Sequence, residues 1–238
     1  MSDQVELNHS VAHCWYSTYS DSQGSEVVVI EFRHIPKEGF LLDTKIRGIQ
    51  YHIFETKFMY VLEELFNNLP PDAYFLIPHE ILMYRDGMDR LVQLVERVSP
   101  YKTSQNIDVG YQLLLSIDGQ EYSTKSIPDA MSALEWLTSQ IGLNTYFKVC
   151  GLCDFMFEDG MYGGTDGRHD LMYCFRDHPE VLDKLISIPR KSPSFPHLLL
   201  NLALQDIDLF HSCSAFILTR NFESRIKNVE IRFADNWK

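Results

Sequence analysis

The feature that most constrains the fold is a change of hydrophobic period at Glu55. Before it, the β-branched run EVVVIEFRHI at residues 26–35 and the alternating apolar side chains at residues 45–54 both predict strands. After it, apolar side chains recur at three- and four-residue spacing, which predicts an amphipathic helix that ends before NNLPPD. The apolar positions of this helix are Phe58, Val61, Leu62, Leu65 and Phe66. The chain therefore opens as strand, strand and helix.

Further elements follow the same two periods. The spacing of Leu91, Leu94, Val95 and Val98 predicts a helix over residues 86–100. The dipeptide Asp118-Gly119 between strand-like runs predicts a hairpin. Other predictions are a short strand at residues 73–78, a helix at 128–141, a strand at 145–149 and helices at 177–191 and 195–210. No internal repeat is evident.

These elements predict an α+β protein with antiparallel sheet portions, packed helices and a C-terminal four-cysteine knuckle. We expect a strand–strand–helix portion at residues 1–100 and a hairpin–helix–strand portion at 101–238. The composition break at residues 99–108 is weak, so a single domain is the alternative.

The cysteine spacing predicts a metal site. Cys150 and Cys153 form a CxxC motif, and Cys174 and Cys213 complete the pattern C-x2-C-x20-C-x38-C. Four thiolates fill a tetrahedral zinc site and leave no open position for water, so the ion would be structural. His169 or His178 could replace Cys213 as the fourth ligand.

Three other interpretations of these residues stay open. The cysteines could be plain core residues, because cysteine is often buried. Cys150 and Cys153 could form a redox dithiol, which requires that both are accessible and that one thiol has a low pKa. His169 and Asp170 could belong to a metal-dependent hydrolase, although their further ligands cannot be assigned.

Charge narrows the class of partner. Lys and Arg number 21 against 33 Asp and Glu, which gives a formal net charge of −12. This acidity argues against nucleic acid or an anionic membrane surface and favours a basic or neutral protein. The N-terminus shows no pattern of a signal peptide, and no apolar stretch is long enough to span a bilayer. We therefore expect a soluble, cytoplasmic protein whose cysteines are thiols or metal ligands, and whose oligomeric state the sequence leaves open.

Residues 128–225 resemble a largely uncharacterised, mostly bacterial family. The resemblance rests on the order CxxC, Tyr-Gly, CFR and a final cysteine before an arginine, and it implies that the family's four cysteines correspond to Cys150, Cys153, Cys174 and Cys213. Tyr162-Gly163 matches the family's Tyr-Gly turn, but no proline precedes it. Residues 214–216, Ser-Ala-Phe, replace the family's Pro-acid-Phe.

The family implies no established activity, but it is similar to small acidic proteins that are encoded near bacterial toxins. Together with the acidity and the lack of a catalytic constellation, it predicts a non-enzymatic binding protein with a structural zinc site. Such a protein could be an immunity protein that neutralises a basic toxin. A hydrolase that uses His169 and Asp170 is the alternative.

Overall fold

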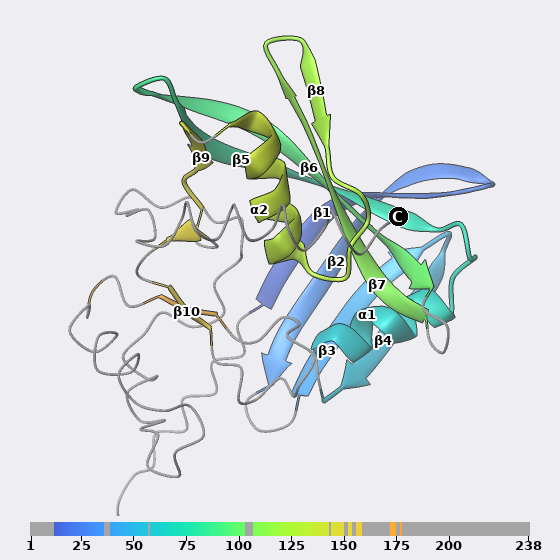
Figure 1. Cartoon of the computed structure of the whole chain (residues 1–238). Coiled ribbons are helices and arrows are strands. Elements are labelled where there is room, and N and C mark those ends of the chain that lie inside the picture. Colours follow the sequence, from blue (N-terminus) through green and yellow to red (C-terminus); the bar gives the residue numbers. More distant parts are fainter. Residues whose placement is uncertain are drawn as a thin grey trace, which may run out of the picture. The chain divides into compact units, whose positions relative to one another are not determined.

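Two antiparallel meanders, each followed by a helix, dominate the computed structural model (Figure 1). The first contains β1 (Ala12–Asp21), β2 (Gly24–Ile35), β3 (Gly39–Ile46), β4 (Ile49–Glu55) and α1 (Phe58–Asn67). The second contains β5 (Tyr74–Arg85), β6 (Met88–Lys102), β7 (Ile107–Ile117), β8 (Gln120–Ser123) and α2 (Ala130–Ile141). The short strands β9 (Thr145–Phe147), β10 (Met156–Glu158) and β11 (Met172–Cys174) follow. The order of elements thus repeats although the sequence showed no repeat.

The structure describes part of the chain, and every structural statement below concerns that part. It comprises residues 12–35, 39–56, 58–102, 107–142, 144–149, 152–153, 156–158, 172–174 and 177. The helices predicted at residues 177–191 and 195–210 lie outside it, apart from residue 177.

The strands are joined in the hydrogen-bonded order β4-β3-β2-β1-β5-β6-β7-β8, with β9 also paired to β5 and β10 paired to β11. The chain forms two compact units, one from residues 1–77 and 98–109 and the other from 78–97 and 110–238. Each unit draws on residues from both sides of position 100, and the domain boundary predicted there stays a prediction.

Three two-residue turns fix the register of the hairpins. At Arg47-Gly48, Asp86-Gly87 and Asp118-Gly119, the first residue has φ of 52° and the second has φ of 80–83°. Positive φ at both central residues defines the type I′ turn, whose twist matches that of the strands it connects. Glycine at the second position accepts this backbone without steric cost.

The structure confirms much of the predicted order. The strand predicted at residues 26–35 lies within β2, and the predicted helices correspond to α1 and α2. The Asp118-Gly119 hairpin and the strand near residue 145 are also present. The residues at 45–54 include a turn between β3 and β4, where a continuous strand was expected. The α+β class holds, but the antiparallel sheet outweighs the helices.

The helix predicted at residues 86–100 is wrong, because these residues form the Asp86-Gly87 turn and most of β6. Leu94, Glu96 and Val98 are all buried, as expected for alternate positions of a strand. Leu91 is 66% exposed, although the helical interpretation placed it on the apolar face. The burial of these residues therefore follows the two-residue period of a strand and not the 3.6-residue period of a helix.

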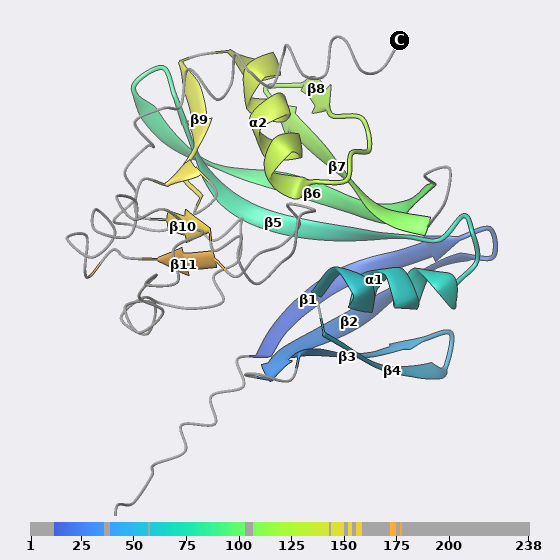
Figure 2. The same cartoon turned by 60° about the horizontal axis from the view of Figure 1, so that its bottom comes forward.

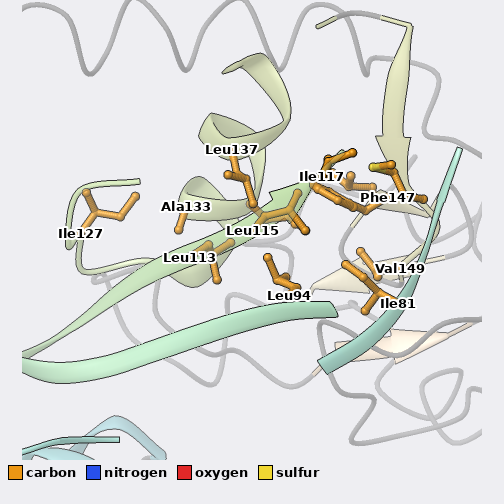
Figure 3. Close-up of a cluster of buried hydrophobic side chains, with 13 residues drawn as sticks. Ile81, Leu94, Leu113, Leu115, Ile117, Ile127, Ala133, Leu137, Phe147 and Val149 are labelled. Carbon is orange, nitrogen blue, oxygen red and sulfur yellow. The ribbon is translucent and has the colours of Figure 1, made fainter. Parts of the chain in front are cut away.

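Each unit has its own apolar core. In the first unit, α1 lies along one face of the meander and buries Val61, Leu62, Leu65 and Phe66 (Figure 2). In the second unit, α2 starts at the cap Asp129, whose carboxylate accepts from the backbone N–H groups of Met131 and Ser132. It then buries Leu134 and Leu137 among side chains of β5, β6, β7 and β9 (Figure 3). Neither described helix is long and apolar enough to cross a membrane.

A polar network holds the β3–β4 turn against the β1–β2 turn in the first unit. Arg47 donates from Nη2 to Oδ1 of Asp21 at 2.9 Å and to the carbonyl oxygen of Gly24 at 2.8 Å. The hydroxyl of Tyr19 donates to Oδ2 of Asp21 at 2.7 Å, and this bond is the main reason that the pKa of Asp21 is lowered. The network fixes the end of the β3–β4 hairpin.

Candidate functional site

The CxxC motif begins in a tight turn that packs into the core of the second unit. The backbone N–H of Leu152 donates to the carbonyl oxygen of Val149 at 3.0 Å, which closes a four-residue turn. Val149, which Figure 3 shows in the buried cluster, and Leu152 are fully buried. Cys153 is 8% exposed. Cys150 lies outside the described residues.

The β10–β11 ladder returns Cys174 toward the CxxC motif. The Cα atoms of Cys174 and Met156 are partners in this ladder, and Met156 follows Cys153 by three residues. From the spacing of paired strands and the maximum reach of three residues, the Cα atoms of Cys153 and Cys174 are at most about 17 Å apart. The two cysteines therefore lie much nearer to each other than an extended chain with twenty residues between them would allow.

The remaining predicted ligands are not placed. Cys213, His169 and His178 lie outside the described residues, as does Asp170 of the hydrolase interpretation. Within the described part of the chain, no group of three or more His, Cys, Asp or Glu side chains could hold a metal ion. The four-ligand site and the hydrolase both stay predictions.

Two further cysteine observations bear on the alternatives. Cys153 is a free, buried thiol, so it does not meet the accessibility that a redox dithiol requires. Cys14 is exposed on β1 in the first unit, whereas Cys153 and Cys174 belong to the second.

A buried histidine–glutamate pair lies in the second unit. Nε2 of His79 on β5 lies 3.1 Å from Oε2 of Glu96 on β6, and the two side chains are 11% and 5% exposed. With Glu96 ionised, Nε2 carries the proton and donates the hydrogen bond. The contact gives a buried carboxylate at a core-facing position a hydrogen-bond partner, which suits a structural role.

The sequence contained a signal for this pair that the helix prediction hid. The two-residue turn at Asp86-Gly87 places His79 and Glu96 diagonally across the β5–β6 hairpin and on the same face. Once residues 88–102 are recognised as a strand, this contact follows from the register.

The face of the first meander that α1 leaves uncovered has exposed apolar side chains. Tyr16, Val27 and Val29 are 69%, 81% and 44% exposed, and Tyr16 is the cross-strand partner of Val29. We call these three residues the open-face patch. On the same face, Arg33 forms an ion pair with Glu31 at 2.7 Å, and Nδ1 of His52 lies 2.6 Å from Oδ1 of Asp43.

Searches of protein-family models, curated proteins and solved structures found no match to this chain. The family resemblance in residues 128–225 is therefore untested, and the assignment of function depends on the chain's own residues.

Replacement of His79 by Ala is expected to lower the free energy of unfolding by about 3 kcal/mol, because it leaves the Glu96 carboxylate buried without its partner. Glu80→Ala, which changes the exposed neighbour on β5, should change it by less than about 0.5 kcal/mol. Urea denaturation measures both. Equal, small effects of the two variants would show that the pair contributes nothing.

Proposed function

We propose that this chain is an acidic, cytoplasmic binding protein whose partner is a basic protein. The open-face patch carries the proposal, because clustered apolar side chains on a solvent-facing sheet are typical of protein interaction sites. The net charge of −12 supports a basic partner, since complementary charge accelerates encounter and disfavours acidic competitors. An immunity protein that neutralises a basic toxin is the specific role we infer from the sequence resemblance.

The patch and the charge would have different tasks. Tyr16 and Val27 can bury apolar area in a complex, which provides most of the affinity. The charged pairs around them are already satisfied within the face, so they need no partner to neutralise them. Long-range attraction would come from the excess of acidic residues in the whole chain and would weaken with salt.

The test uses the tagged chain as bait in a lysate of the source cells at low and high salt. We expect a basic protein to be recovered at low salt and less of it at high salt. The double variant Tyr16→Ser/Val27→Ser should lower its affinity by about tenfold or more, because two apolar anchors are lost. Gln120→Ser, an exposed polar change on β8, is the matched control. Recovery of no partner, or equal recovery by the double variant, would contradict the proposal.

We also propose that the C-terminal four-cysteine knuckle is a structural zinc site formed by Cys150, Cys153, Cys174 and Cys213. The turn at Val149–Leu152 and the pairing of Cys174 with Met156 support it, because they limit the separation of the Cys153 and Cys174 Cα atoms to about 17 Å. A closed site beside a buried turn would stabilise the fold. It would leave no open coordination position on the ion at which chemistry could occur.

Elemental analysis of the purified chain tests the site. We expect one zinc per chain, lost in both Cys150→Ser and Cys213→Ser but kept in Cys14→Ser, whose cysteine is exposed in the other unit. Loss of zinc should also lower the unfolding midpoint, since structural zinc contributes on the order of 10 kcal/mol to folding. Zinc kept in Cys213→Ser alone would make His169, His178 or water the fourth ligand. A wild-type chain without metal would refute the site.

A further inference from the structure

Strand β4 has a regular outer edge. It is the first strand in the order of the sheet, and it pairs with β3 without interruption from Glu55 opposite Phe40 to Ile49 opposite Ile46. Among the described strands, none pairs with its other side. The polar network of Arg47 and Asp21 holds the hairpin end in place. The edge is therefore a straight template of backbone groups.

The Arg47-Gly48 turn decides which backbone groups point outward. In a two-residue hairpin the residues that flank the turn, here Ile46 and Ile49, form a hydrogen-bonded pair. Bonding to β3 then alternates along β4, so the N–H and C=O groups of Gln50, His52 and Phe54 face away from β3. Three consecutive alternate residues are thus available to an added strand.

Among the described residues, this edge shows little of the usual protection against strand addition. Proteins protect edges with proline, lysine, bulges or very short strands. Residues 49–55 contain no proline or lysine, and Ile49 and Phe54 are 58% and 47% exposed. At the other end of the sheet order, β8 is a strand of only four residues.

The stretch of sequence that contains β4 and the helix after it is acidic. Residues 49–72, which include β4 and α1, contain Glu55, Glu63, Glu64 and Asp72 against the single basic residue Lys57. The Glu64 carboxylate accepts hydrogen bonds from the neutral side-chain amides of Asn67 and Asn68. Lys45, opposite Gln50, makes the turn end of β4 less acidic than its Glu55 end. A basic side chain would therefore be attracted toward the Phe54–Glu55 end.

We propose that β4 binds an extended, lysine- or arginine-rich segment of the protein partner as an additional strand of the sheet. Backbone hydrogen bonds to Gln50, His52 and Phe54 would give the register, as in other cases of strand addition. The acidic excess of residues 49–72 and of the whole chain would select a basic segment. The inference rests on the proposed function, because it supplies the recognition mode for a basic partner.

The direct test measures fluorescence anisotropy with a labelled peptide of alternating Lys and Val, as long as β4. It should bind the wild-type chain, whereas the peptide of alternating Glu and Val should not. Alternate residues of a strand form backbone hydrogen bonds to the same side. Two methylated forms of the Lys peptide are therefore compared, one N-methylated at every Lys and the other at every Val. One of the two should lose binding. Equal binding of the Lys and Glu peptides, or binding retained by both methylated peptides, would overturn the inference.

A matched pair of variants tests the same edge from the protein side. His52→Pro removes an outward N–H that β3 does not use, and proline is tolerated at such edge positions. His52→Thr keeps the N–H, and both variants lose the hydrogen bond to Asp43. We expect the Lys peptide to bind the proline variant about tenfold more weakly than the threonine variant. Equal affinity in two variants of equal unfolding midpoint would overturn the inference. If the partner recovered from the lysate still binds both variants equally, the proposed function stands but the inference that β4 binds the partner fails.

Discussion

The two-residue turns are the constraint on which the rest of the described structure depends. Because Arg47-Gly48, Asp86-Gly87 and Asp118-Gly119 all have positive φ at both residues, each hairpin has a fixed register. A shift of one residue would turn every buried side chain of a strand to the opposite face. The turns at Asp86-Gly87 and Asp118-Gly119 thus decide that Leu94 and Leu113 face the core, and the turn at Arg47-Gly48 decides that Leu42 and Ile53 are buried.

The two units differ in what their sheets leave available. In the first unit, α1 buries one face of a four-strand meander and leaves the open-face patch and the β4 edge accessible. In the second, α2, Val149 and Leu152 contribute to one apolar core, and the pair of His79 and Glu96 lies in the same unit. This division favours binding in the first unit and structural stabilisation in the second. The proposals for partner and zinc follow this division.

Sequence reasoning succeeded where one period was unambiguous. The helix α1 and the Asp118-Gly119 hairpin each had a single interpretation. Residues 88–102 did not, because Leu94 and Val98 are four apart and lie on one face of either a helix or a strand. Only Leu91 and Glu96 distinguish the two, and both have burial opposite to the helical expectation. The contact of His79 with Glu96 depended on that register and could not be predicted without it. The cysteine spacing alone did not indicate how far Cys174 lies from the CxxC motif, and a limit on that distance required the β10–β11 pairing.

The central claim is that the turn at Arg47-Gly48 leaves β4 with an outward row of unbonded backbone groups. Residue-resolved amide hydrogen exchange of the free chain tests it most directly. The account predicts fast exchange at His52 and Phe54 and slow exchange at Tyr51 and Ile53, whose N–H groups bond to β3. Slow exchange at all four residues would contradict it, because the edge would then be covered or the register would be different.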